Sequence, residues 1–305
     1  MEWNGHLVRG GVQVRILAAT DFSTRSHRAL RRAGVLAQDK GAELVIVHVV
    51  DDDHPTQLVE IERREAERIL AEQIGAISEL RDAKCHPKVV AGDPFYGILR
   101  MAETVKADLI VMGAHRKQLL RDIFVGTTVE RVIRTGSYPV LMVNNEVRRP
   151  YRNPLAAVDV SEPSVNAIRA AMSTGLIGDQ GATLLHAFLP LGKGKLSVSG
   201  TDEAAINEYV ASERERVVDE LAGFLTANKL LGPKLSLRVE EGGIFEVIAR
   251  TVEETRPDLL ILGTHSRSWL LKVLLGSVTE EALRCLDIDI LAVPPVRSLP
   301  KNVKA

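Results

Sequence analysis

The sequence predicts an α/β protein built from two tandem, doubly wound parallel sheets, and two observations carry this prediction. Short apolar runs alternate with longer segments of helical periodicity along the 305-residue chain, which is the rhythm of parallel strands joined by helical crossovers. The same series of segments also occurs twice, as expected of duplicated structural units. A composition with 45% hydrophobic but only 4% aromatic residues suits aliphatic cores, and the length suits two domains of ordinary size.

The repeat is clearest in two glycine-containing stretches that each follow a buried apolar run. The residues that recur 150 positions later are Gly113, His115 and Gly126, which return as Gly263, His265 and Gly276. Nearer the N-terminus, Asp21 and His48 return as Asp159 and His186 at an offset of 138. The offsets differ by about twelve residues, so the second half contains an insertion. We place it at residues 191–200 and expect a polar, flexible segment there.

The elements follow from hydrophobic periodicity and from turn and cap residues. Expected strands of the first half are 14–19, 44–50, 87–91, 107–112 and 139–143, and its helices start at Ser23 or Ser26, run from 57 to about 80, and cover 95–105 and 128–134. Expected strands of the second half begin at Leu155 and cover 182–188, 235–239, 258–262 and 289–293, with helices around 165–171, over 203–227 and 244–254, and from 277. The predicted domains are therefore residues 1–146 and 154–305, joined by a linker at 147–153.

Each glycine-containing stretch ends at a predicted helix start. Thr127 and Ser277 each precede a glutamate by three positions, which is the pattern of a capping box. A glycine loop that opens onto a helix N-terminus can hold a phosphate through backbone N–H groups and the helix dipole. The same caps form without a ligand, so this motif leaves both interpretations open.

The last strand of each half, 139–143 and 289–293, is short and apolar. Because an unpaired apolar edge strand invites association, we predict that these two strands pair within one chain as a pseudo-dimer. Pairing between two copies of the chain, as a homodimer, is the other form of association considered.

Several function classes lack support in the sequence. The 39 basic and 40 acidic residues nearly cancel, so no net charge favours nucleic acid or an anionic membrane. No apolar run is long enough to span a bilayer, and no export signal is recognised at the N-terminus, so a cytoplasmic location is expected. Cys85 and Cys285 form no motif for a disulfide or a metal site.

The glycine stretches resemble the nucleotide loop of the universal stress protein family: glycine, two residues, glycine, nine residues, glycine, then Ser or Thr. Arg116 and Ser266 stand where the second glycine would be. The aspartate after the first strand, the histidine in the second and the turn Gly92-Asp-Pro94 also resemble this family, so the chain is similar to a tandem-domain member. The resemblance implies an adenine-nucleotide-hydrolase-like fold with five-stranded sheets of order 3-2-1-4-5. It also implies that some members bind ATP and others do not.

The expected ligand is therefore ATP or a related adenine nucleotide, with or without Mg²⁺, and no protein metal site is expected. The nucleotide-binding candidates are Asp21, Gly113, Arg116, Gly126 and Thr127 in the first half, and Asp159, Gly263, Ser266, Gly276, Ser277, Val278 and Thr279 in the second. Alternatives stay open for several of these: each aspartate can instead cap a helix, and each first glycine can serve only a sharp turn. His48 and His186 are interpreted as core residues, and His115 and His265 as loop-bracing residues.

The residue at the second-glycine position, Arg116 or Ser266, distinguishes the two hypotheses for function, nucleotide binding and binding of other partners. Ser266 is small, so the second half is expected to bind nucleotide before the first, whereas Arg116 either fills the first pocket, which we favour, or pairs with a phosphate. The first hypothesis is a stress-response protein whose nucleotide regulates contacts with a protein partner, without catalysis, although weak ATP hydrolysis stays open. The alternative is a module of the same fold that binds proteins or small ligands other than nucleotides.

Overall fold

The computed structural model describes residues 13–114, 127–230, 232–264 and 275–295. The first half contains β1 (Arg15–Ala19), α1 (Thr24–Lys40), β2 (Glu43–Val50), α2 (Thr56–Ala76), the 3₁₀ turn η1 (Ser78–Leu80), β3 (Lys84–Ala91), α3 (Pro94–Val105), β4 (Leu109–Gly113), α4 (Thr128–Thr135) and β5 (Val140–Val143). The second half contains β6 (Pro154–Ala157), α5 (Glu162–Ser173), β7 (Ala182–Phe188), α6 (Lys193–Val198), α7 (Glu203–Ala227), β8 (Leu235–Glu241), α8 (Ile244–Thr255), β9 (Leu259–Gly263), α9 (Ser277–Cys285) and β10 (Asp289–Val293).

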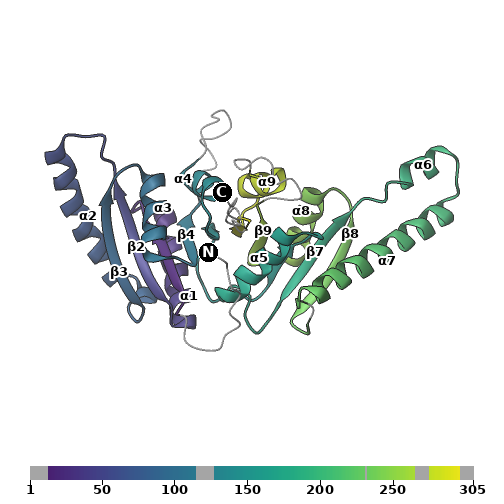
Figure 1. Cartoon of the computed structure of the whole chain (residues 1–305), viewed down its shortest axis with the longest axis horizontal. Helices are drawn as coiled ribbons and strands as arrows, with labels where there is room; N and C mark the ends of the chain where they lie inside the picture. Colours follow the sequence, from purple (N-terminus) through teal and green to yellow (C-terminus); the bar gives the residue numbers. More distant parts are fainter. Residues whose placement is uncertain (1–12, 115–126, 231, 265–274, 296–305) are drawn as a thin grey trace, which may run out of the picture.

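Both halves have the predicted α/β fold, and their sheets join into one. The strand order is β3-β2-β1-β4-β5-β10-β9-β6-β7-β8, so each half contributes five parallel strands in the order 3-2-1-4-5. At the centre β5 and β10 pair antiparallel, with Leu141 opposite Leu291. The predicted pairing of the two edge strands is therefore confirmed, and Figure 1 shows the halves side by side with α2 and α7 at opposite ends.

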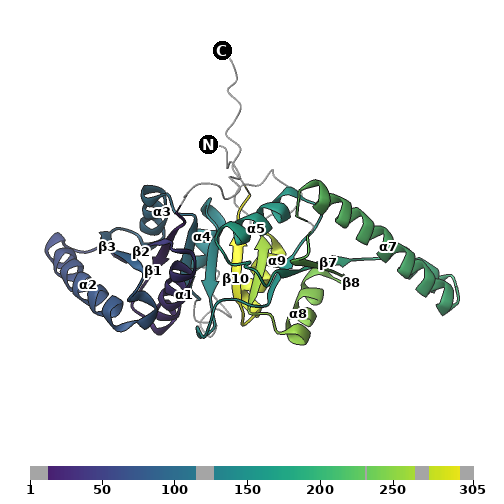
Figure 2. The same cartoon turned by 90° about the horizontal axis from the view of Figure 1, so that it is seen from below.

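Helices cover both faces of the sheet, as Figure 2 also shows. Alternate strand residues point to opposite faces, so Ile16 and Ala18 belong to one apolar cluster and Leu17 to the other. Helices α1, α5 and α7 pack on the first face, and α3, α4, α8 and α9 on the second. The inner strands β4, β5, β9 and β10 are buried on both faces, so their sequences are almost continuously apolar. The outer strands β3 and β8 are partly exposed and carry polar residues.

Two predicted elements differ in the structure. The helix expected to reach about residue 80 ends at Ala76 and is followed by the separate turn η1. The insertion at 191–200 was wrongly expected to be polar and flexible, since it contains α6. This helix is anchored to neighbouring elements, because the Gly192 N–H donates to the Tyr209 hydroxyl at 3.1 Å and Lys193 pairs with Glu241 at 2.7 Å.

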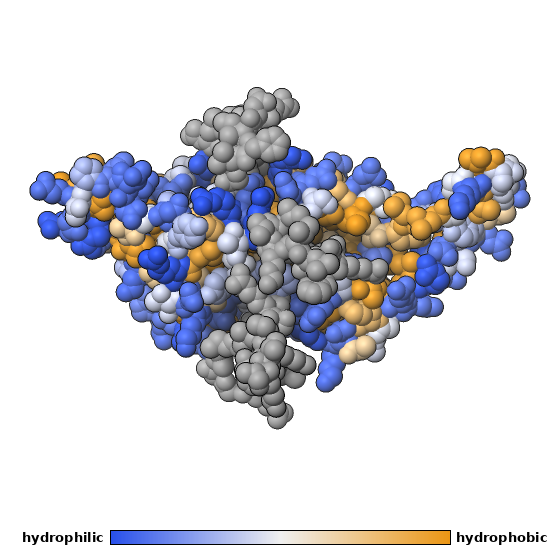
Figure 3. All heavy atoms as spheres, turned by 45° about the horizontal axis from the view of Figure 1, so that its top comes forward, coloured by the Kyte–Doolittle hydropathy of each residue, from blue (hydrophilic) through white to orange (hydrophobic). Residues whose placement is uncertain are grey.

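The insertion also exposes apolar side chains. Leu191 is 85% exposed and Val198 is 91% exposed. Figure 3 shows apolar surface at the far end of the second half, where Figure 1 places α6. Composition alone suggested a solvated loop, because Gly, Ser and Lys dominate the segment between these residues.

The segment between the halves, expected as a linker, is packed into their junction. Tyr151 is 4% exposed, and its hydroxyl donates to Asp289 of β10 at 2.6 Å. The backbone N–H groups of Asn144 and Asn145 donate to the other carboxylate oxygen at 2.8 and 2.9 Å. From α1, Arg32 lies 3.6 Å from Asp289 and 3.9 Å above the centre of the Tyr151 ring. A buried polar cluster therefore ties the two halves together beside the paired strands.

Candidate functional site

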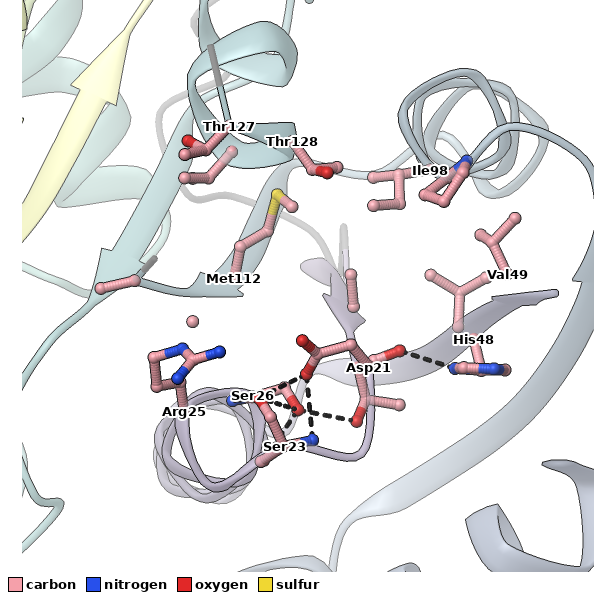
Figure 4. A pocket seen from close by; sticks show the side chains of 17 residues that line it. Asp21, Ser23, Arg25, Ser26, His48, Val49, Ile98, Met112, Thr127 and Thr128 are labelled. Atoms are coloured by element: carbon pink, nitrogen blue, oxygen red, sulfur yellow. Dashed lines mark hydrogen bonds between the residues drawn. The ribbon is translucent and has the colours of Figure 1, made fainter. Parts of the chain in front are cut away.

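A cleft of about 500 Å³ opens at the carboxyl ends of β1, β2 and β4 (Figure 4). In this strand order β2 and β3 lie on one side of β1, and β4 and β5 lie on the other. The carboxyl ends of β1 and β4 therefore form a topological switch point, which is where ligands bind in open α/β sheets. Aliphatic side chains form much of the lining: Ala19, Val47, Val49, Ile98, Met112, Ala114 and Val129. Polar groups come from the loop after β1 and the starts of α1 and α4: Thr20, Asp21, Ser23, Arg25, Ser26, Thr127 and Thr128, with His48 from β2.

Asp21 lies at the mouth of the cleft as a fixed hydrogen-bond acceptor. Its Oδ1 accepts from the Ser23 hydroxyl at 2.5 Å and from the Ser23 N–H at 3.0 Å. Burial raises the pKa of Asp21, but hydrogen bonds from Ser23 and Ser26 outweigh burial and hold the pKa below its usual value. The carboxylate therefore presents negative charge to the cleft.

The sequence left open that Asp21 caps the helix that follows it, and the structure does not have this cap. Ser23, and not Asp21, caps α1, because its Oγ accepts from the Ser26 N–H at 3.3 Å. Asp21 holds the capping hydroxyl in place. The Oδ1 of its carboxylate is engaged in this way.

Phe22 sets the direction of this loop. It adopts φ +61°, in the left-handed region that residues other than glycine seldom occupy. Its ring stacks on His48, with ring centres 4.1 Å apart. His48 in turn bonds through Nδ1 to the Thr20 carbonyl oxygen at 2.9 Å. Because a carbonyl oxygen only accepts, Nδ1 carries the hydrogen, and Nε2 of the neutral ring is an acceptor. The histidine is satisfied as predicted, but it is half-buried at the cleft and not a full core residue.

Gly113 ends β4 against the first turn of α1. Its φ is not in the left-handed region, so a sharp turn is not the reason for glycine here. A Cβ at this position would lie 2.6 Å from the backbone carbon of Arg25. Glycine therefore permits the close approach of helix and strand that shapes one side of the cleft.

The start of α4 confirms the predicted capping box in the first half. The Thr127 hydroxyl accepts from the Glu130 N–H at 3.4 Å, and the Glu130 carboxylate accepts from the Thr127 N–H at 3.3 Å. Thr127 and Thr128 line the cleft opposite Asp21 (Figure 4). The electropositive end of a helix thus faces the same space as the carboxylate.

The second half reproduces part of this arrangement. The Asp159 carboxylate accepts from the hydroxyls of Ser161 and Ser164, the latter at 2.5 Å. The backbone N–H of Asp159 donates to the Ser164 hydroxyl oxygen at 3.0 Å. His186 bonds through Nδ1 to the Val158 carbonyl oxygen at 2.7 Å, as His48 does to Thr20. The aspartate after the first strand therefore accepts from a serine two residues later in both halves, and the histidine of the second strand bonds to a backbone carbonyl in both. The surroundings differ in detail, because Val160 stands where Phe22 stacks on His48.

The helix start after β9 corrects a prediction. Ser277 is the first residue of α9 and not its cap, because Gly276 occupies the cap position and no side-chain cap bond forms. The Gly276 N–H donates to the Thr264 carbonyl at 2.8 Å. Relative to the repeat, α9 begins one residue earlier than α4. Val278 packs on the apolar core, and the Thr279 hydroxyl donates to the Gly263 carbonyl at 3.3 Å.

The chain matches the model of the universal stress protein family twice, over residues 14–144 and 150–294. It belongs to the universal stress protein family. A universal stress protein of Synechocystis is 24% identical over 285 residues, which span 92% of this chain and 89% of that protein. One from Methanocaldococcus jannaschii is 32% identical over 148 residues, 45% of this chain and 86% of that protein. The solved structure of a universal stress protein from Archaeoglobus fulgidus covers 92% of this chain and 98% of its own, with a TM-score of 0.64 at 18% identity.

Three candidates of this universal stress protein lie outside the described residues: Arg116, Gly126 and Ser266. His115 and His265 lie there as well. The structure thus brings Asp21, Gly113 and Thr127 together around one cleft, and the predicted order of nucleotide binding between the halves stays a prediction.

Sequence reasoning missed Arg25 and Thr128, which also line the cleft. A signal was present, because Arg25 lies in the first turn of the helix that follows the switch-point aspartate. Within the described ranges, no group of three or more His, Cys, Asp or Glu side chains is placed to hold a metal ion. Among the helices in those ranges, none is both long and apolar enough to cross a membrane.

Proposed function

We propose that this universal stress protein binds an adenine nucleotide in the cleft of its first half and acts by ligand-dependent control of a protein contact, in the cytoplasm, and not by catalysis. The observation that carries the proposal is the pairing of two opposite features across one cleft. The ionised Asp21 lies on one side, and the capped N-terminus of α4 lies on the other.

Each part of an adenine nucleotide has a chemically suitable surface in this cleft. Val49, Ile98 and Met112 offer apolar walls to a flat base. The carboxylate of Asp21 accepts hydrogen bonds from ribose hydroxyls or an exocyclic amine, and the Thr127 hydroxyl and α4 N–H groups favour a phosphate. Membership of a family in which some proteins bind ATP adds support. The same features also fit ADP or AMP, so the proposal names the adenine nucleotide class.

A regulatory role is proposed because three polar residues of the cleft, Asp21, Ser23 and Thr127, are engaged in fixing its shape. Asp21 accepts from Ser23, Ser23 caps α1, and Thr127 caps α4. A general base must be free to take a proton at the reacting atom. Binding that changes the contacts of these helix starts gives a route from nucleotide to surface.

Titration calorimetry of the full chain with ATP tests the proposal. We expect binding by the unchanged protein, and at least a tenfold loss for Asp21→Ala at the first site, since this substitution removes a charged acceptor. The matched variant Asp159→Ala reports on the second half, where the sequence predicts the tighter site. Binding unaffected by Asp21→Ala would reject the first-half cleft, and ATP turnover abolished by Asp21→Asn would reject a purely regulatory role.

A further inference from the structure

Arg25 is the one arginine of α1 that the established features of the fold leave without a role. Further along the helix, Arg28 pairs with Glu146, Arg31 with Glu79, and Arg32 with Asp289. Arg25 is half-buried and lines the cleft. Within the described residues, it forms no ion pair or hydrogen bond through its guanidinium. A cation at a cleft, with no counterion among the residues that the structure describes, favours an anionic ligand.

Its position places this charge at one end of the cleft. The backbone of Arg25 lies against Gly113, the last residue of β4, so the side chain enters from the β4 side. Figure 4 shows Arg25 and Thr127 toward the same side of the cleft, with His48 and Val49 toward the other. The guanidinium and the α4 N-terminus therefore form the electropositive end, and aliphatic side chains with His48 form the other end.

We propose that Arg25 binds a phosphate group of the ligand and makes the first-half cleft selective for phosphorylated adenine compounds over adenosine. This inference rests on the proposed nucleotide binding and adds the residue that discriminates among adenine ligands. A guanidinium offers several N–H donors to phosphate oxygens, and such charge-assisted bonds are stronger than those between neutral groups.

The second half lacks this device. At an offset of 138, Arg25 corresponds to Pro163 and Thr24 to Glu162. Proline has no side-chain donor, and the exposed Glu162 adds negative charge at the first turn of α5. The duplicated cleft regions therefore differ in charge at the same point of the fold, and discrimination by phosphate at this position is expected in the first half alone.

The test is calorimetric titration of the full chain with ATP, AMP and adenosine, using the unchanged protein, Arg25→Gln and Arg25→Lys. We expect Arg25→Gln to weaken ATP binding about tenfold and to leave adenosine binding unchanged, with Arg25→Lys keeping part of the affinity. Arg28→Gln is the matched control, because it removes the same charge one turn further along α1, where Arg28 pairs with Glu146 and does not line the cleft. It should bind ATP as the unchanged protein does.

The possible results separate the two proposals. If the unchanged chain binds ATP and adenosine but Arg25→Gln weakens both equally, or neither, Arg25 does not recognise phosphate and this inference fails. An equal loss in Arg28→Gln would also overturn it, because the effect would then follow from net charge. If the unchanged chain binds neither ATP nor adenosine, the proposed function itself fails.

Discussion

Replacing Asp289 is expected to destabilise the junction between the halves more than any surface carboxylate would. The residue is 0% exposed, and it accepts from Tyr151 and from the backbone N–H groups of Asn144 and Asn145 while lying 3.6 Å from Arg32. Asp289→Ala leaves these donors and the buried guanidinium of Arg32 without their acceptor. Breaking a buried charge pair on one side costs about 3–5 kcal/mol, and we expect a loss of this size in the free energy of unfolding.

The substitution Asp289→Asn keeps one acceptor oxygen but removes the negative charge, so it distinguishes the effect of the hydrogen bonds from that of the charge. Burial raises the pKa of Asp289 above its usual value. The hydrogen bonds from Tyr151, Asn145 and Asn144 and the charge of Arg32 oppose this shift but do not cancel it. The charged form is therefore held at a cost, and a neutral amide that keeps one acceptor oxygen should lose only about 2 kcal/mol at neutral pH. The raised pKa of Asp289 contributes stability to the folded protein at a pH below 3.8, the pKa of this group in the unfolded chain. This contribution is lost as the pH rises through the pKa of Asp289 in the folded protein. The difference between wild type and Asp289→Asn should therefore narrow from acid toward neutral pH.

Urea unfolding followed by far-ultraviolet circular dichroism measures these differences. Asp179→Ala is the matched control, since the Asp179 side chain is fully exposed and pairs with Lys234 at the surface. The stability of this variant should stay close to that of wild type. An Asp289→Ala protein within 1 kcal/mol of wild type would refute the reasoning, because this is far below the expected cost of a broken buried pair. So would an Asp289→Asn protein less stable than Asp289→Ala.

Three further predictions compare the halves or test the cleft. Gly113→Ala should cost about 1–3 kcal/mol in unfolding free energy, because its Cβ would lie 2.6 Å from the α1 backbone, whereas Gly263→Ala, with 3.2 Å to α5, should cost less. Thr127→Ala should cost about 1 kcal/mol through loss of the α4 cap, and Ser277→Ala should cost little; equal urea midpoints for the two variants would contradict this. The lowered pKa of Asp21 gives stability that is present above its unfolded pKa and lost as pH falls through the folded one, so acid titration should bring wild type and Asp21→Asn closer together in urea midpoint.

The repeat made the fold predictable from sequence. Two copies of the same series of apolar runs predict five strands per half, with an aspartate after the first strand and a histidine within the second. The strand order 3-2-1-4-5 was implied by the resemblance to the universal stress protein family, and the structure has this order. The edge pairing followed from a different property, because β5 and β10 are short, apolar and last in their halves. These features depend on local composition and periodicity, which a sequence states directly.

The parts that failed depend on contacts between distant residues. Thr127 and Ser277 stand in the same sequence pattern, yet only Thr127 is a cap, because α9 begins one residue earlier in the repeat and Gly276 takes the cap position. The role of Gly113 depends on how closely α1 approaches β4, which no local pattern states. Likewise, Tyr151 appeared to lie in a solvated linker between arginines and prolines, and only its hydrogen bond to Asp289 shows that the segment is part of the junction.

Fusion of the halves into one chain explains why the junction and the cleft both differ between copies. In a symmetric dimer each interface residue occurs twice, so a cluster around Asp289 would form twice. Here the position equivalent to Asp289 is Pro139, and the position equivalent to Arg32 is Ala170. The cluster therefore forms once, with a tyrosine from the connecting segment that has no second copy. Since one chain encodes both halves, a substitution such as arginine against proline at positions 25 and 163 changes a single cleft. The common fold thus keeps the paired sheets, while the residues at the first turn after each aspartate differ between the halves.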